Sequence, residues 1–451
     1  MSASDTPPVR RRVEQLAAEG IDVVRVTYPD LIGTERARDV LLDHLPSACD
    51  HGLAFCRAVY HTSPQGDTVN VAGGLDAGLP DICVTPDLDT LTTLPWEPGV
   101  ATCLGYVTDP ATGLPAPESP RDLLRGVLER CAEHGLRPVV GPELEYFLCE
   151  AAPEHPQGWE RYSDADGVVY TAGLRADPDN HLLRTLRLLR DLNIGVSGGN
   201  HEYDGSQFEI NLTHGDAAEA ADRAFRFKSA VKELARREGR LATFMAKPFN
   251  DAGGSGFHLH LSCVDQEGGN VFADPSAPYG LSDTARHALA GILTHAPALT
   301  ALANPTVNSY KRFGPHTLAP WLIDWGLDNR SAMVRVPPER GAGSRLELRL
   351  GDASANPYLI VAGTLAAALL GILAREEPPA PLEGYGYDAV RAEVLPMTLP
   401  AALDALEADT ALTELLGKDF SASYLAYKRD EVARFHRHVT DWEFTEYAYH
   451  L

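Results

Sequence analysis

The stretch GPELEYF, residues 141–147, places two glutamates, Glu143 and Glu145, inside a run that is otherwise apolar. Alternate side chains of a strand point to opposite faces, so the two glutamates share one face and Leu144 and Tyr146 take the other. Flanking apolar residues on both sides favour an inner position in a sheet. The stretch therefore predicts a central strand with two carboxylates side by side on one face.

The same alternation recurs in three further stretches, SQFEINL at 206–212, GFHLHLS at 256–262 and SRLELRL at 344–350. An antiparallel sheet with one solvated face produces such alternation, and any one of these strands alone is typical of it. All four ionisable faces, however, lack lysine and carry Glu, His and Arg. We interpret them as the lining of one site, formed by Glu143, Glu145, Glu209, Asn211, His258, His260, Ser262, Arg345, Glu347 and Arg349.

Such a lining has an electrostatic requirement. Two carboxylates about 4 Å apart repel by roughly 4 kcal/mol at an effective dielectric constant near 20. Several of them stay ionised together only if cations share the site. Glutamates with histidine form an oxygen-rich ligand set that suits Mg²⁺ or Mn²⁺ better than Zn²⁺ or copper. Neighbouring arginines suit phosphate or carboxylate, and the combination is typical of phosphoryl transfer.

Bulk composition narrows the class of protein. The chain has 451 residues, 44% of them hydrophobic and 23% charged, which is typical of a soluble globular protein with two domains. A net charge of −24 argues against a nucleic-acid partner and against an anionic membrane surface. The apolar run from Leu359 to Ala374 is shorter than the ~20 residues that span a bilayer, so we expect a buried helix.

Seven scattered cysteines without a C-x-x-C pair indicate reduced thiols. The first twenty residues contain no apolar stretch of the signal-peptide kind. Together these features predict a cytoplasmic protein. The sequence also contains neither G-x-x-x-x-G-K-[ST] nor G-x-G-x-x-G, so no Walker-type or Rossmann-type nucleotide site is predicted.

The chain divides at a stretch with the composition of a linker. Residues 22–28 predict a strand, and residues 60–85, rich in Gly, Asp, Asn and Pro, predict an exposed loop. Residues 108–121 have the composition of a linker, and a helical pattern follows to residue 136. We therefore expect a small N-terminal domain over 1–107 and a larger domain over 108–451.

With these strands in place, the chain resembles the glutamine synthetase family along nearly its whole length. The resemblance rests on GPELEYF, HEYDGSQFEI (201–210), KPFNDAGGSGFHLHLS (247–262), NPTVNSYKRFGPHTLAP (304–320), NRSAMVRVP (329–337) and SRLELRLGDASANPY (344–358). It implies an α+β fold, with a small β-grasp-like N-terminal domain and a large catalytic domain. In the large domain an antiparallel active-site sheet is flanked by helices.

The resemblance also implies roles for individual residues. Glu145, Glu202 and Glu209 would hold one Mg²⁺ or Mn²⁺, and Glu143, His258 and Glu347 a second, with ATP as co-substrate. Contacts to ATP are implied for His260, Ser262, Arg335 and Arg345. Catalytic roles are implied for Arg312 and Arg330, and acid-substrate contacts for Gly254, Arg312, Arg330 and Arg349. The implied assembly is a homo-oligomer of stacked rings, a dodecamer, with active sites at subunit interfaces.

Three departures from the family pattern concern the substrates. Leu318 stands where the family has the glutamate that helps bind ammonium and take its proton, so Leu318 would instead contact an amine with a carbon body. Gly253 replaces an asparagine that contacts glutamate, and residues 58–74 contain no counterpart of the family's D-G-S-S loop. His316 is either a replacement catalytic base or a surface residue.

These observations predict an ATP- and Mg²⁺-dependent ligase that joins glutamate, or a close relative, to an organic amine through an acyl phosphate. One alternative is a true glutamine synthetase with a rebuilt ammonium pocket. Another is a catalytically silent family member with a structural or regulatory role, which the intact set of metal ligands argues against.

Overall fold

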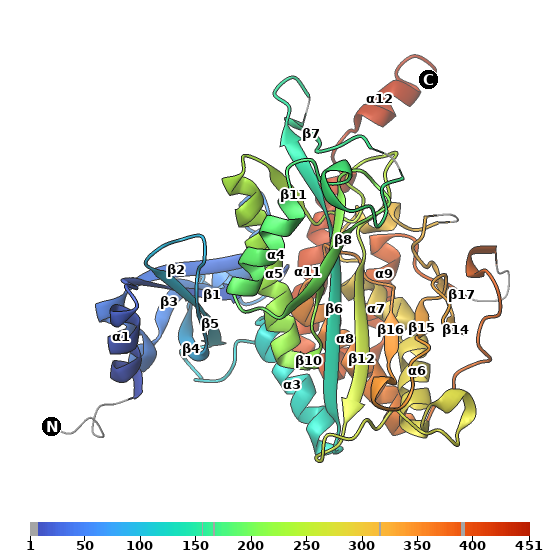
Figure 1. Cartoon of the computed structure of the whole chain (residues 1–451), viewed down its shortest axis with the longest axis horizontal. Coiled ribbons are helices and arrows are strands. Elements are labelled where there is room, and N and C mark those ends of the chain that lie inside the picture. The colour runs from blue at the N-terminus through green and yellow to red at the C-terminus, as the bar shows by residue number, and fades with distance from the viewer. Residues whose placement is uncertain (1–7, 156, 166, 315–316, 389–392) are drawn as a thin grey trace.

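The computed structural model describes residues 8–155, 157–165, 167–314, 317–388 and 393–451. Two sheets organise the chain (Figure 1). The first has five strands in the order β2-β1-β5-β4-β3 and is formed by residues 23–108. Its strands are β1 (Val23–Pro29), β2 (Glu35–Leu41), β3 (Leu53–Cys56), β4 (Asp81–Thr93) and β5 (Val100–Thr108). The helices of this part of the chain are α1 (Pro8–Ala18) and α2 (Leu45–His51).

The second sheet has ten strands, with the path β14-β15-β16-β12-β6-β9-β8 and three short strands that pair with β6. Its central strand is β6 (Arg137–Ala151), which contains the opening stretch of the sequence. The other strands are β7 (Trp159–Arg161), β8 (Val196–His201), β9 (Gln207–Leu212), β10 (Gly215–Asp216), β11 (Leu241–Thr243), β12 (Phe257–Val264), β14 (Trp325–Leu327), β15 (Val334–Val336) and β16 (Leu346–Leu348).

Most of this sheet is antiparallel, as predicted, and the exception is the parallel pair of β14 and β15. A separate two-stranded sheet joins β13 (Leu322–Ile323) to β17 (Glu393–Val394). The helices of this part are α3 (Pro120–Glu133), α4 (His181–Asp191), α5 (Ala217–Arg237), α6 (Asp283–Thr294), α7 (Ala296–Ala303), α8 (Pro357–Ala374), α9 (Leu399–Ala408), α10 (Thr410–Leu416), α11 (Lys418–His436) and α12 (Asp441–Tyr447). The α+β fold class is therefore confirmed.

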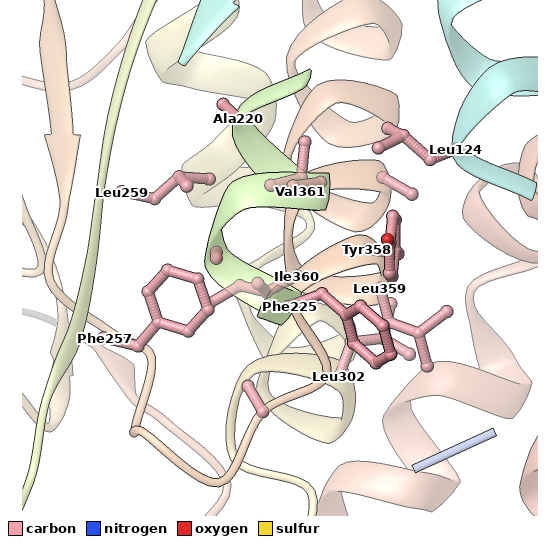
Figure 2. Packing of buried hydrophobic residues seen from close by; sticks show 14 of the residues in the cluster. Leu124, Ala220, Phe225, Phe257, Leu259, Leu302, Tyr358, Leu359, Ile360 and Val361 are labelled. Atoms are coloured by element: carbon pink, nitrogen blue, oxygen red, sulfur yellow. The ribbon is translucent and has the colours of Figure 1, made fainter. Parts of the chain in front are cut away.

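Helices α5 and α8 cover the apolar face of the large sheet. Figure 2 shows Phe257 and Leu259 of β12 directed toward α5 and toward Val361 of α8. On β6, Leu144 and Tyr146 are fully buried, and Tyr146 contacts Phe227 of α5 edge-on at 6.4 Å between ring centroids. Because this face is filled by the core, the ionisable side chains of the same strands lie on the opposite face.

The apolar run predicted as a buried helix is α8. Among the described residues it is the one helix long and apolar enough to cross a membrane, and 78% of it is buried inside the protein. It crosses α6 at two glycines, since a Cβ on Gly371 would lie 2.3 Å from the carbonyl oxygen of His287 and 2.5 Å from the Cα of Gly291. Only glycine permits this approach of the two backbones.

A buried arginine connects the two sheets through the helices between them. Arg121 of α3 donates to Asp87 of β4 at 2.7 Å and to Asp222 of α5 at 2.8 Å. Asp222 also accepts a hydrogen bond of 2.7 Å from the hydroxyl of Tyr358 in α8. The five-stranded sheet is thus bonded to the helices that pack on the large sheet.

The predicted segments agree with the structure to different degrees. The strand over 22–28 and the helix after residue 120 are confirmed by β1 and α3. The exposed loop over 60–85 is partly wrong, because Val69 and Val71 are buried and β4 begins at Asp81. The Gly, Asp and Pro content of this segment predicted exposure, but its apolar side chains pack into the core. The domain boundary after residue 107 stays a prediction.

Candidate active site

Strand register brings the predicted ligands into rows on one face of the sheet. Residues directly opposite on antiparallel strands have Cβ atoms about 4.5–5.5 Å apart, so their side chains meet. β6 pairs with β12 on one side and β9 on the other, and β12 pairs with β16. The opposed pairs are Glu143 with His258, Glu145 with Glu209, and His260 with Glu347.

Glu143 lies between two histidines. Its Oε1 is 3.1 Å from Nε2 of His260, and its Oε2 is 3.8 Å from Nδ1 of His258. Burial opposes ionisation of this carboxyl, but the two neighbouring histidines, His258 and His260, outweigh it and hold the pKa of Glu143 well below its ordinary value. Burial also lowers the pKa of His258, and Arg349 adds to that shift. Glu143 is therefore a carboxylate at neutral pH.

Glu347 is the most buried of the predicted ligands, with 1% of its surface exposed. Its two oxygens each accept a hydrogen bond of 2.6 Å, one from Arg335 and one from Arg349. Burial opposes ionisation, but the charges of His258 and Arg349 lower the pKa of Glu347 to about 2. The carboxylate is thus charged and fully paired within the protein.

Glu202 and Glu209 have the opposite behaviour. Burial, followed by repulsion from Glu145, raises the pKa of Glu202 to about 7 and the pKa of Glu209 to about 8. Each has one amide donor, Asn200 at 2.7 Å for Glu202 and Asn211 at 3.0 Å for Glu209. Burial and the neighbouring carboxylate thus both disfavour ionisation, and a divalent cation would favour it.

The donor atoms are close enough together to coordinate a cation. Within the described residues, two sets have ligand atoms that all lie within 4.8 Å of one another, Glu143/Glu209/His258 and Glu143/His260/Glu347. This oxygen-rich chemistry fits Mg²⁺ or Mn²⁺. The sets differ from the predicted division, in which Glu145 and Glu202 accompany Glu209, and His258 accompanies Glu347. The division of ligands between ions stays a prediction.

Glu145 is positioned by neutral donors. Its Oε2 accepts hydrogen bonds of 2.8 Å from Nε2 of Gln207 and 2.8 Å from the backbone N–H of Gly256. The same Gln207 amide donates to the carbonyl oxygen of Gly254 at 3.0 Å. Gln207 was not predicted as a site residue, although it shares the β9 face of Glu209 and Asn211, so the strand alternation contained the signal.

The acidic face opens into a cavity of about 790 Å³, here called the acidic cavity. Its lining combines predicted residues with others that were not predicted as site residues. The predicted members are Glu143, Glu145, Glu202, Glu209, Gly254, His258, Arg312, Leu318, Arg330 and Arg349, and the additional members include Tyr170, Tyr203, Gln207, Asn329, Ser331, Tyr385 and Tyr387.

The three arginines for which the resemblance implies contacts to the acid substrate all line the acidic cavity. Arg312 is 4% exposed and donates to the carbonyl oxygen of Leu350 at 3.2 Å. Burial lowers the pKa of Arg312. Arg349 is buried and donates through Nε to the backbone carbonyl of Arg330 at 3.1 Å, whereas Arg330 itself is exposed. Cationic donors thus lie both deep in the cavity and near solvent.

A second cavity of about 520 Å³, here called the histidine cavity, lies on the other side of Glu143. It is lined by His260, Ser262 and Arg345, three of the four residues predicted to contact the nucleotide. Arg345 donates through Nε to Nδ1 of His260 at 3.1 Å. The fourth, Arg335, is instead held by Glu347 and Asp328, both at 2.6 Å. Glu143 lines both cavities.

Leu318 lies in the lining of the acidic cavity with 54% of its surface exposed. Its φ of 60° is left-handed, which is rare for a residue with a bulky side chain. The other residue predicted for the amine pocket, His316, lies outside the described residues. Tyr170, Tyr203 and Tyr385 lie on loops, where no periodic pattern could have identified them.

The chain belongs to the glutamine synthetase family, because the family's catalytic-domain model matches residues 117–447. Membership places it among the ATP-dependent amide-forming ligases. It is 35% identical to a glutamine synthetase of Methanocaldococcus jannaschii over 97% of this chain and 98% of the relative. It is 33% identical to a glutamine synthetase of Thermotoga maritima over 98% of this chain and 99% of the relative.

Solved structures give the same assignment. The structure of apo GmaS without ligand superimposes with a TM-score of 0.85 at 35% identity, covering 97% of this chain and 99% of the other. A crystal structure described as a novel glutamine synthase homolog gives a TM-score of 0.81 at 28% identity, covering 94% of this chain and 97% of the other.

Proposed function

We propose that this protein joins the side-chain carboxylate of glutamate, or of a close relative, to an organic amine at the expense of ATP. The observation that carries the proposal is the acidic cavity itself. Its floor holds charged groups suited to an acid and a phosphate, whereas Leu318 offers an aliphatic surface to the amine. A bare ammonium ion gains nothing from that surface, but an amine with a carbon body buries apolar area against it.

The two cavities would bind different substrates. In this proposal His260, Ser262 and Arg345 hold ATP in the histidine cavity, with Arg335 supporting Glu347. Arg312, Arg330 and Arg349 hold the acid, whose carboxylate attacks the γ-phosphate to give an acyl phosphate and ADP. The amine then displaces phosphate to form the amide. The junction at Glu143 is where the triphosphate would reach the acid.

Two or more Mg²⁺ or Mn²⁺ ions would be held by Glu143, Glu145, Glu202, Glu209, His258 and Glu347. When bound, such ions neutralise phosphate oxygens and offset the charge of the two anions that must meet. The raised pKa values of Glu202 and Glu209 support this assignment, because burial and then repulsion from Glu145 make both carboxylates costly to ionise without a nearby cation.

The similar structures support an amine other than ammonia. GmaS stands for γ-glutamylmethylamide synthetase, and another solved structure of it, also at 35% identity, is a complex with ADP. The relatives named glutamine synthetase favour the second candidate, a true glutamine synthetase that uses ammonium. A catalytically silent role is disfavoured because all six predicted metal ligands are present.

The decisive experiment measures phosphate release from ATP with glutamate, Mg²⁺ and a panel of amines that includes methylamine and ammonium. The proposal expects release with organic amines at concentrations where ammonium gives little. A preference for ammonium at millimolar concentration would support the second candidate instead. The Glu143→Gln variant is the control, because it keeps the shape of the site but removes the carboxylate common to both cavities.

We further propose a cytoplasmic homo-oligomer of stacked rings with twelve subunits, whose active sites are completed across interfaces between the 1–107 and 108–451 domains of neighbours. Light scattering of the purified protein measures the mass directly. A monomeric mass with full ligase activity would contradict the shared active site.

A further inference from the structure

Large apolar side chains surround the mouth of the acidic cavity. Tyr170, Tyr203, Leu318 and Tyr385 are 69%, 59%, 54% and 53% exposed, and all four line this one cavity. Single exposed apolar residues are normal on a protein surface, but a group around a cavity marks a binding surface. These residues are called the aromatic mouth below.

The floor of the same cavity is different in character. His258, Arg312 and Arg349 are buried there, at 8%, 4% and 7% exposure, beside the half-buried carboxylates of the sheet. A molecule that enters therefore meets the apolar side chains and the exposed Arg330 first, and the buried charged groups last. An amine would place its nitrogen at the charged floor, where the acid lies, and its carbon body at the mouth.

The backbone holds two of the mouth residues in a rare conformation. Tyr170 has a φ of 57° and Leu318 a φ of 60°, in the left-handed region that large side chains seldom adopt. Such conformations persist only where the surroundings fix them, and they concentrate at functional sites. Here both occur at exposed apolar residues of one cavity.

The segment that carries Tyr170 is fastened to the turn that carries Tyr203. The hydroxyl of Ser206 donates to the carbonyl of Ser163 at 2.9 Å and accepts from its N–H at 3.0 Å. The N–H of Tyr170 donates to the carbonyl of His201 at 3.0 Å. A Cβ on Gly205 would lie 2.5 Å from the carbonyl oxygen of Ala165, so the two segments are in direct contact. The backbone that carries Tyr170 and Tyr203, two of the four mouth residues, is therefore preorganised.

We propose that the amine substrate is a primary amine with an aromatic or similarly bulky apolar body, which packs against the aromatic mouth formed by Tyr170, Tyr203, Leu318 and Tyr385. This inference rests on the proposed function and specifies its substrate class. The mouth residues determine specificity and take no part in the chemistry. Aromatic rings favour offset or edge-to-face contacts, which several tyrosines around one opening can provide.

The bond changes are those of amide formation. The amine nitrogen bonds to the acyl carbon of the acyl phosphate, the carbon–oxygen bond to phosphate breaks, and phosphate leaves with the electron pair. The protonated amine loses two protons in total, one to the departing phosphate and one to solvent. No oxidant or reductant is required.

The experiment compares benzylamine, methylamine and ammonium as amines in the phosphate-release assay with glutamate, ATP and Mg²⁺. The native protein is expected to give the highest kcat/KM with benzylamine. Tyr203→Ala and Tyr170→Ala are each expected to raise KM for benzylamine by about 2- to 10-fold, the value of one aromatic contact, with kcat and the methylamine reaction nearly unchanged. Tyr203→Phe should retain native behaviour, and Tyr449→Ala, an exposed tyrosine outside the cavity lining, is the matched control.

Several results would overturn the inference. If methylamine equals benzylamine in the native protein, the aromatic-amine class is wrong while the proposed ligation of organic amines stands. If ammonium equals or exceeds benzylamine, the preference for organic amines is wrong as well, and the second candidate is supported. If no amine and no ammonium releases phosphate, the proposed function itself fails. If Tyr203→Ala changes the mass of the assembly and leaves the preference among amines intact, the tyrosine serves a subunit contact instead.

Discussion

Under the proposed function, the side chain at position 318 selects between ammonium and organic amines. Leu318 places a hydrocarbon surface on a cavity whose floor is charged, at the position where the sequence resemblance expects an ammonium-binding glutamate. Replacing Leu318 by glutamate adds an anion that attracts ammonium and can accept its proton. We expect Leu318→Glu to raise kcat/KM for ammonium by about 10-fold or more, relative to organic amines, in the phosphate-release assay.

Leu318→Ala is the control for this prediction, because it removes the aliphatic surface without adding charge. Leu318→Ala should lower kcat/KM for organic amines and leave kcat/KM for ammonium unchanged. Identical profiles for all three proteins would remove Leu318 from the explanation of amine choice.

The two glutamates with raised pKa values predict how stability depends on pH. The pKa values of Glu202 and Glu209, about 7 and about 8, lie above their ordinary value of 4.5. Protonation therefore favours the folded state. The contribution of these groups is full below pH 4.5 and is lost as pH rises through 7 and 8. Without divalent ions, the Tm should fall between pH 6.5 and 8.5.

Mg²⁺ should reverse this trend, because it binds the ionised carboxylates and releases on the order of one proton per carboxyl near pH 7. Calorimetry in buffers of different ionisation enthalpy measures that release. Glu209→Gln should reduce both the release and the pH dependence, while Glu267→Gln at an exposed position should change neither. A flat stability profile in the absence of divalent ions would contradict the assignment.

At the scale of elements, the crossing of α6 and α8 depends on glycine. A Cβ on Gly371 would overlap the backbone of α6, at 2.3 Å from the carbonyl oxygen of His287. Gly371→Ala should therefore lower the free energy of unfolding by about 1–3 kcal/mol, or more if the helices cannot separate. Urea denaturation measures the change.

The matched control is Gly126→Ala in α3, where an added Cβ would have no heavy atom within 4 Å. There the substitution should stabilise the protein by about 0.5–1 kcal/mol, since alanine favours a helix over glycine. Equal effects at the two glycines would show that close packing at the crossing is not the cause.

A strand of the large sheet could be predicted from the sequence where polar and apolar residues alternate clearly along it. Glu143 and Glu145, and likewise His258 and His260, alternate with apolar residues, so both the strand and its polar face could be inferred. β8 contains the Gly198–Gly199 pair and has no such pattern. Alternation also says nothing of register, which decides that Glu143 faces His258 and that Glu347 faces His260. The tyrosines of the cavity mouth lie on loops, where no periodic pattern in the sequence could have identified them as site residues.

At the scale of the whole molecule, Arg121 joins the five-stranded sheet to the helices of the large sheet. It is 8% exposed, its bond to Asp87 is buried, and its bond to Asp222 is partly buried. Removing it leaves the buried Asp87 and the half-buried Asp222 without their cation, so Arg121→Ala should lower the free energy of unfolding by about 3–5 kcal/mol. The measurement is thermal or urea unfolding.

Arg130→Ala on the same helix is the control. Its ion pair with Glu133 is 3.5 Å long, and both side chains are more than half exposed, so its loss should change stability by less than about 1 kcal/mol. If Arg121→Ala behaves like Arg130→Ala, the two sheets are held together by apolar packing alone.

The carboxylate of Glu143 belongs to the walls of two chambers, and a different histidine approaches each of its oxygens. A ligand that binds this carboxylate from one cavity alters the electrostatic potential in the other. By thermodynamic reciprocity, the factor by which a first occupant tightens a second equals the factor by which the second tightens the first. Because Glu143 lines both the acidic cavity and the histidine cavity, the binding free energies of their occupants are coupled.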